Sequence, residues 1–183
     1  VEVGVRYKKQ AWSWSVTGFL LLMDNEIAYD PLLFLNRNLN ETRRLGVDTE
    51  VAWAHKGYGA STRWSFIDAR FTGGDYEDNK VPLVPWGHGV CAAWVDLSKN
   101  VRLTGTYTFV SEQYRGGDDA NADRKMESYG LLGLRLNAAV SRRVDLIVSV
   151  DNLADERYAP TVYGNAFYPG SGRTFRAGMD IEL

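Results

Sequence analysis

The side chains of this chain that could do chemistry are few, and their spacing does not suit catalysis. Asp119, Asn121 and Asp123 offer oxygen atoms at alternate positions, as the loop of a calcium site does. Such a loop needs glycine where Arg124 stands and a bidentate glutamate where Gly130 stands, so the match fails. No paired carboxylates, Ser-His-Asp set or Cys-His pair can be assembled from the spacing. We therefore expect no catalytic residue, no metal site and no cofactor.

Composition and charge exclude further classes of protein. The formal net charge is −2 and no basic run occurs, which argues against nucleic acid as a partner. Cys91 is the only cysteine, so an internal disulfide is impossible; its neighbours Gly89, Ala93 and Val95 favour a small residue on an outward face. No stretch of about 18 apolar residues exists, which excludes a spanning helix. Aromatic residues are abundant, with six Trp and ten Tyr.

The elements that must position these side chains are predicted to be β-strands. Near the carboxyl end, Phe175, Ala177 and Met179 alternate with Arg176 and Gly178, and similar alternation recurs upstream. A period of two is typical of a strand with one apolar and one polar face. Nine strands are predicted, at 1–8, 11–28, 42–55, 59–71, 87–97, 101–114, 128–138, 143–151 and 172–183.

The joints between these strands alternate between short and long. The short ones are 9–10, 56–58, 98–100 and 140–142, and the long ones are 29–41, 72–86, 115–127 and 152–171. Tight periplasmic turns and long outer loops are typical of an antiparallel up-and-down transmembrane β-barrel of the bacterial outer membrane. Aromatic residues near strand ends, such as Trp12, Trp53 and Trp86, resemble its interfacial girdles. Outer-membrane lipid is then an expected partner.

An odd number of strands indicates that the barrel is incomplete. Bacterial single-chain barrels have even strand numbers, and the alternation is already running at Val1. We therefore predict one domain, 1–183, that forms the C-terminal strands of a larger barrel whose earlier strands are absent. Charged residues on the inward face are expected to form ladders across strands, with a binding role left open: Arg102, Arg135, Arg176, Asp145, Asp180 and Glu182.

Several segments, taken in order, resemble the C-terminal barrel region of TonB-dependent receptors. They are residues 40–50, 65–71, 81–85, 150–158, 168–170 and 173–175, which together cover essentially the whole chain. The matching positions include Gly46, Val47, Asp48, Asn152, Leu153, Asp155, Arg157, Tyr158, Pro169, Gly170, Arg173 and Phe175. Asp48 stands where the family usually has Glu, and the chain ends in Leu183 where the family commonly ends in Phe.

The resemblance implies a barrel of about 22 strands that takes up a scarce ligand, most often a ferric siderophore, with energy supplied through TonB. The plug domain that contacts TonB is absent from this sequence. The resemblance also implies insertion by the barrel assembly machinery. Ligand contacts are expected from aromatic residues of the long loops: Tyr29, Phe34, Tyr76, Tyr114, Tyr163 and Phe167.

The other matched positions are interpreted as structural. Gly46 and Gly178 would face inward, where the missing side chain allows a plug or a neighbouring strand to approach. Asn152 and Asp155 follow a strand and can hydrogen-bond their own backbone to start the loop. Three alternatives remain: a complete barrel of about eight strands with a structural or adhesive role, an outer-membrane enzyme, and a soluble β-sandwich.

Overall fold

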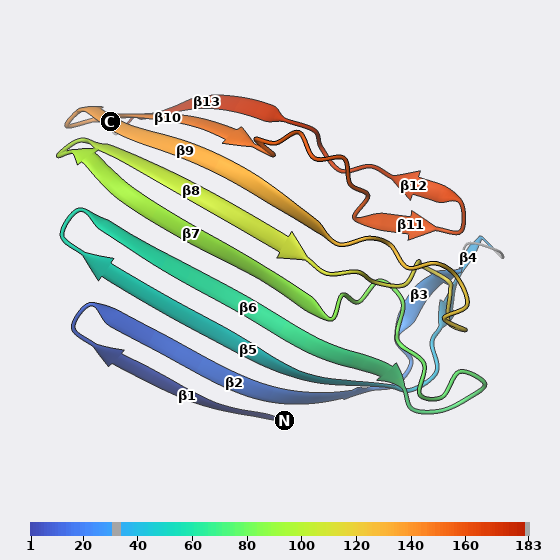
Figure 1. The fold of residues 1–183 in the computed structure, drawn as a ribbon. Coiled ribbons are helices and arrows are strands. Elements are labelled where there is room, and N and C mark those ends of the chain that lie inside the picture. Colours follow the sequence, from blue (N-terminus) through green and yellow to red (C-terminus); the bar gives the residue numbers. More distant parts are fainter. Residues whose placement is uncertain (31–33, 182–183) are drawn as a thin grey trace.

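The computed structural model describes residues 1–30 and 34–181. Nine strands form one antiparallel sheet in which each strand pairs with the next (Figure 1). Their order is β1 (Glu2–Lys9), β2 (Trp12–Met23), β5 (Thr42–His55), β6 (Tyr58–Phe71), β7 (Gly87–Ser98), β8 (Val101–Val110), β9 (Tyr129–Ser141), β10 (Val144–Asp151) and β13 (Thr174–Ile181). No helix long and apolar enough to span a membrane occurs in the part of the chain that the structure describes.

The sheet is open, because β1 and β13 form its two opposite edges. The short turns lie together at one end of the strands and the long loops at the other, as the alternation of joints predicted (Figure 1). An independent barrel of about eight strands would need a closed cylinder. The open edges therefore disfavour the small-barrel alternative.

Two predicted strands are too long, and two hairpins were not predicted. Residues 11–28 do not form one strand, because a turn with Asn25 at φ 55° ends β2 at Met23. β8 likewise ends at Val110 rather than at residue 114. The long loops add the hairpins β3 (Ile27–Asp30) with β4 (Leu35–Asn38) and β11 (Thr161–Tyr163) with β12 (Ala166–Tyr168). Glu182 and Leu183, predicted at the end of the last strand, lie outside the described residues.

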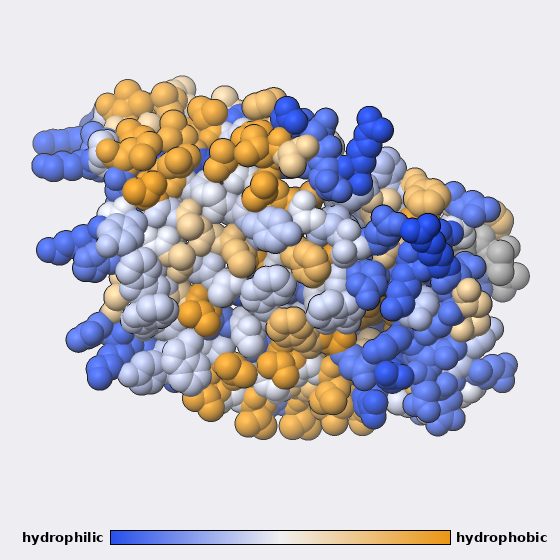
Figure 2. Space-filling view, in the orientation of Figure 1, coloured by the Kyte–Doolittle hydropathy of each residue, from blue (hydrophilic) through white to orange (hydrophobic). Residues whose placement is uncertain are grey.

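The register divides the sheet into an apolar and a polar face. Thr62 pairs with Cys91, and Cys91 pairs with Tyr107, so these three side chains share one face with the outward residues of their strands. Aliphatic and aromatic side chains cover this apolar face, whereas hydrophilic side chains gather at both ends of the strands (Figure 2). Asp48, Glu50 and Arg63 lie on the opposite, polar face.

The predicted charge ladders on the polar face are confirmed in part. Arg102 donates to Asp96 at 2.6 Å, and Arg176 pairs with Asp151 on the neighbouring strand. Arg135 instead donates to Asn137 within its own strand at 3.0 Å. Asp145 and Asp180 face each other in register, and neither makes an ion pair among the described residues, so for these two the prediction is wrong. Glu182 is not described.

Glycines in the sheet allow aromatic rings to lie flat across the neighbouring strand. At Gly46, a Cβ would overlap the ring of Phe19 and lie 2.7 Å from the carbonyl oxygen of Phe66. The predicted close approach at Gly46 is therefore confirmed, and Phe19 is the group that approaches. Around Gly178 no described heavy atom lies within 4 Å of such a Cβ.

The buried apolar core lies at the loop end of the sheet. Leu39, Ala69, Phe71 and Val81 form this cluster, and Phe71 is only 1% exposed. Loop segments cover the ends of β5 and β6 there, whereas both faces of the sheet itself carry exposed side chains. The long loops are therefore folded structures that present a fixed surface.

Candidate functional site

The β3–β4 hairpin is tied to the loop between β8 and β9 through Arg37. Its Nε donates to Asp30 at 3.0 Å, and its guanidinium also pairs with Asp119. The hydrogen bond to Asp119 raises the pKa of Arg37 above its ordinary value, so this guanidinium is charged at every physiological pH. The carbonyl of Asp119 also accepts a hydrogen bond from Asn79 at 3.0 Å.

The segment rejected as a calcium loop is a structural junction. Asn121 donates to the carbonyls of Lys80 and Asp118 at 3.0 and 3.1 Å, and it accepts from the Lys80 amide at 2.7 Å. The carboxylate of Asp118 accepts from the amides of Ala122 and Asp123. No group of three His, Cys, Asp or Glu side chains lies close enough to hold a metal ion in residues 1–30 and 34–181. The oxygens of this segment bind its own backbone and the adjacent loop.

The loop between β10 and β13 is closed by Asn152. Its Oδ1 accepts from the Glu156 amide at 2.8 Å, while Nδ2 donates to the carbonyls of Glu156 and Ser171 at 2.9 and 3.1 Å. The prediction that Asn152 bonds its own backbone is therefore confirmed. Asp155 behaves differently, because its Oδ1 accepts from the amide of Arg173 at 2.9 Å, across the loop. Asn152 and Asp155 therefore both join the beginning of this loop to its end by hydrogen bonds.

A hollow of about 490 Å³ lies between the loops that follow β8 and β10. Its lining contains four cations, Arg115, Arg124, Lys125 and Arg157, two carboxylates, Glu127 and Glu156, and three aromatic rings, Tyr129, Tyr158 and Phe167. The rings of Tyr129 and Tyr158 lie 4.5 Å apart, and the Arg115 guanidinium lies 5.7 Å from the centre of the Phe167 ring. The hollow therefore offers positive charge beside flat apolar faces.

The four cations differ in how far their charge is already balanced. Arg124 pairs with Glu127, and Lys125 lies 3.7 Å from Glu112. Arg115 stacks on Phe167 and donates to a carbonyl, but it makes no ion pair among the described residues. Arg157 likewise has no ion-pair partner in the described part of the chain. Arg115 and Arg157 are thus the cations best placed to attract an anionic ligand.

Lowering the pH should weaken the contact between Glu112 and Lys125, beside this hollow, only at pH values below the ordinary pKa of a carboxyl group. The indole N–H of Trp86, and then Lys125, hold the pKa of the Glu112 carboxyl below its ordinary value of 4.5. Because the pKa is lowered on folding, this stabilisation is complete above pH 4.5 and is lost as the pH falls through the folded value.

The component of the tryptophan fluorescence that depends on Glu112 should therefore stay constant from about pH 7 to about pH 5 and change below that range. Glu112→Gln should remove this acid-induced component, since the amide cannot ionise. A component dependent on Glu112 that titrated near pH 6 would contradict the assignment.

The structure distributes the six aromatic residues that were predicted as ligand contacts. Phe167 lines the hollow, and Tyr114 lies beside it, with Lys125 5.2 Å from its ring centre. Tyr29 and Tyr163 come together edge to face at 5.6 Å, between the β3–β4 and β11–β12 hairpins. The other two lie away from the hollow: Phe34 is 81% exposed, and Tyr76 packs near Phe71.

Sequence reasoning missed four residues that line the hollow, Arg115, Arg124, Lys125 and Tyr129, and it assigned Arg157 only a structural role. A signal was present, because three of the cations fall in one loop, at positions 115, 124 and 125. What the sequence could not show is that the loop after β10 adds Arg157 and Phe167 to them. The loops after β8 and β10 are joined by the backbone hydrogen bond from the Gly116 amide to the Val162 carbonyl, at 2.8 Å.

Comparisons with known proteins agree with this architecture. The family model described as TonB dependent receptor-like, beta-barrel matches residues 1–153. Among solved structures, the ferric citrate transporter FecA superposes with a TM-score of 0.82 at 19% identity, covering 98% of this chain and 30% of FecA. The ferric yersiniabactin uptake receptor FyuA from Yersinia pestis gives 0.81 at 22% identity, covering 100% of this chain and 29% of FyuA.

The ferric-catecholate import receptor Fiu from E. coli K12 gives a TM-score of 0.77 at 17% identity, with 98% of this chain and 27% of Fiu covered. These superpositions establish a shared fold. The chain spans less than a third of the length of each of these three receptors. Its open sheet corresponds to one sector of their barrels.

Proposed function

Because this chain belongs to the TonB-dependent receptor-like β-barrel family, we propose that it forms the C-terminal sector of a barrel that imports a ferric siderophore across the bacterial outer membrane. The observation that carries the proposal is the hollow between the loops, where four cations surround three aromatic rings. The long loops, which lie outside the cell in such barrels, would capture the ligand.

The chemistry of the hollow suits an anionic chelate of iron. Ferric complexes of catecholate and carboxylate chelators carry negative charge, which Arg115 and Arg157 would attract. Aromatic chelating groups can stack against Tyr158 or Phe167, and a volume of about 490 Å³ accommodates a small ligand. The similar structures named above import ferric catecholate, ferric yersiniabactin or ferric citrate according to their names.

Energy coupling would require parts of the receptor beyond this sector. In our proposal a plug fills the barrel and contacts TonB, and the barrel assembly machinery inserts the barrel. The polar face supports a filled interior, since Asp48, Glu50, Arg63 and His88 line a hollow of about 610 Å³ there. Such a surface would leave many polar groups for a plug to bind. No catalytic constellation argues for an enzyme in the described residues.

Removing the free cations of the hollow should weaken ligand binding. In the full-length receptor, Arg157→Ala and Arg115→Ala should each raise the dissociation constant about 10- to 150-fold, since a charge-assisted contact is worth about 1.5–3 kcal/mol. Quenching of tryptophan fluorescence by a ferric tris-catecholate and by ferric citrate would measure the binding.

Arg142→Ala, which removes an exposed cation at the opposite end of the sheet, is the matched control. Its affinity for both iron complexes should equal that of the unchanged receptor. Unaltered affinity in both loop variants would show that the hollow is not the binding site.

A further inference from the structure

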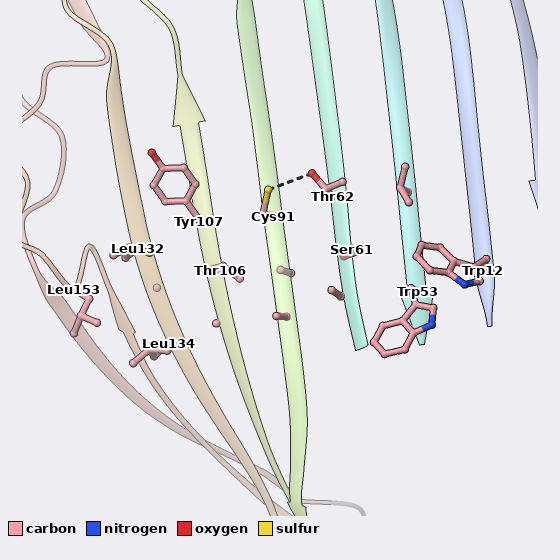
Figure 3. A pocket seen from close by; sticks show the side chains of 16 residues that line it. Trp12, Trp53, Ser61, Thr62, Cys91, Thr106, Tyr107, Leu132, Leu134 and Leu153 are labelled. Carbon is pink, nitrogen blue, oxygen red and sulfur yellow. Dashed lines mark hydrogen bonds between the residues drawn. The ribbon is translucent and has the colours of Figure 1, made fainter. Parts of the chain in front are cut away.

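A third hollow, of about 590 Å³, lies on the apolar face of the sheet. Its floor is formed by small residues, Ala60, Cys91, Ala93 and Gly105, on three adjacent strands. Trp12 and Trp53 wall it on one side, and Leu132, Leu134 and Leu153 wall it on the other (Figure 3). The result is a groove that crosses the strands on the side facing lipid.

Two of the polar side chains that line this groove, Thr62 and Cys91, contact each other. Trp64 Nε1 donates to Thr62 Oγ1 at 2.7 Å, and Thr62 Oγ1 lies 3.2 Å from Cys91 Sγ. These two side chains therefore have no need of a partner from outside. The accessible surface of the groove is mostly carbon, so an apolar occupant suits it.

One end of the groove meets a cluster of aromatic rings beside two short turns. Trp53 lies 6.1 Å from Trp12, 6.4 Å from His55 and 5.3 Å from Tyr58, measured between ring centres. Two exposed lysines adjoin this cluster. Lys9 pairs in register with Trp12, and Lys56 follows His55 in the turn.

The short turns as a group are basic, and the long loops are rich in acidic residues. Each of the four turns has lysine or arginine within it or directly beside it, and the turn residues themselves include no aspartate or glutamate; the cations are Lys8 and Lys9, Lys56, Lys99, Arg142 and Arg143. Hydrophilic side chains project from this end of the sheet, at the left of Figure 2. In a barrel of this family the short turns face the periplasm. The carboxylates nearest this end, Asp96, Asp145 and Asp180, lie on the polar face, so the rim beside the apolar face attracts anions in the headgroup layer of the inner leaflet.

We propose that the groove holds an acyl chain of an anionic phospholipid of the periplasmic leaflet, whose phosphate lies between Lys9 and Lys56. Membrane strands are tilted by about 35–45°, so a groove perpendicular to them rises from the basic rim toward the middle of the bilayer. The aromatic cluster around Trp53 lies at the level of the headgroup, and Leu134 and Leu153 meet the chain farther along. The proposal rests on the outer-membrane barrel but not on the identity of the imported ligand.

The test is lipid retention by the full-length receptor in detergent, measured by native mass spectrometry with dioleoyl phosphatidylglycerol and dioleoyl phosphatidylethanolamine. The double variant Lys9→Gln with Lys56→Gln should bind phosphatidylglycerol about 25-fold more weakly, from about fivefold for each lysine. Its affinity for phosphatidylethanolamine should change little. Lys99→Gln, in a turn farther from Trp53, is the matched control and should bind as the unchanged protein does.

The groove itself is tested by filling it. Ala93→Leu should displace both lipids, whereas Ala92→Leu, whose side chain lies on the polar face, should displace neither. If Ala93→Leu prevents folding, Cys91→Leu is the second variant for the same purpose. If Lys99→Gln and the double variant lost the same affinity for phosphatidylglycerol, the effect would come from the overall charge of this end and not from a site between Lys9 and Lys56. That result would overturn the proposal.

Retention of lipid by a folded filled-groove variant would also overturn it, as would complete displacement of the lipid by glycerol phosphate. Binding of iron complexes is measured in a separate experiment, by quenching of tryptophan fluorescence. A failure here would therefore leave the proposed transport function untouched.

Discussion

Replacing Asn152 with alanine should lower the free energy of unfolding by about 3 kcal/mol and release the loop between β10 and β13. The side chain is 5% exposed and makes three hydrogen bonds, which join Glu156 at the start of the loop to Ser171 at its end. Alanine would remove three hydrogen bonds, at about 1 kcal/mol for each. Its φ of 51° adds strain, since asparagine tolerates this region better than alanine.

Urea unfolding of the full-length receptor in detergent, followed by tryptophan fluorescence, would measure the loss. Asn165→Ala is the matched control, because Asn165 is exposed in the same loop. We expect the control to change stability by less than about 0.5 kcal/mol. Equal midpoints for Asn152→Ala and the control would show that the hydrogen bonds of Asn152 do not hold this loop.

Gly46→Val should destabilise the barrel by about 3 kcal/mol and reduce the folded fraction. The new side chain would overlap the Phe19 ring, and the backbone oxygen of Phe66 lies 2.7 Å from the position of the added Cβ. A ring can rotate away, but the backbone of a paired strand cannot move without breaking its ladder. The mobility shift of folded against heated protein in SDS gels would report the folded fraction.

Gly178→Val is the matched control, since that position lies on the same polar face and is open on the described side. It should leave the folded fraction unchanged. Adding Phe19→Ala to Gly46→Val should restore part of the loss, because the ring contact disappears while the backbone contact remains. Equal folded fractions for Gly46→Val and Gly178→Val would contradict the interpretation.

The strands of the sheet could be predicted because a membrane barrel imposes one rule on every strand. Lipid on one side and polar contents on the other require alternation, and the segments 42–55 and 143–151 follow it closely. The β2 boundary failed for a local reason, since Leu20, Leu21 and Leu22 break the alternation before the turn. The strands of the two small hairpins have three or four residues each, which is too short to show a period at all.

The candidate site was less predictable, because its parts come together only through the packing of the loops. Asn152 could be assigned from sequence, since an asparagine after a strand bonds to nearby backbone. Arg157 and Lys125 are far apart along the chain, and nothing local indicates that they line one hollow. Phe34 is the same residue type as Phe167 and Tyr76 is also aromatic, so residue type alone could not separate them.

The cross-bracing of the long loops restricts how this surface can evolve. Arg37, Asn121 and Gly116 each join one loop to another, so a substitution at a junction disturbs two loops at once. A change of ligand preference would then require coordinated substitutions, and exchanging single loops between relatives should fail more often than exchanging the whole set. The loops behave as one heritable unit, and epistasis among them is the expected signature in any collection of variants.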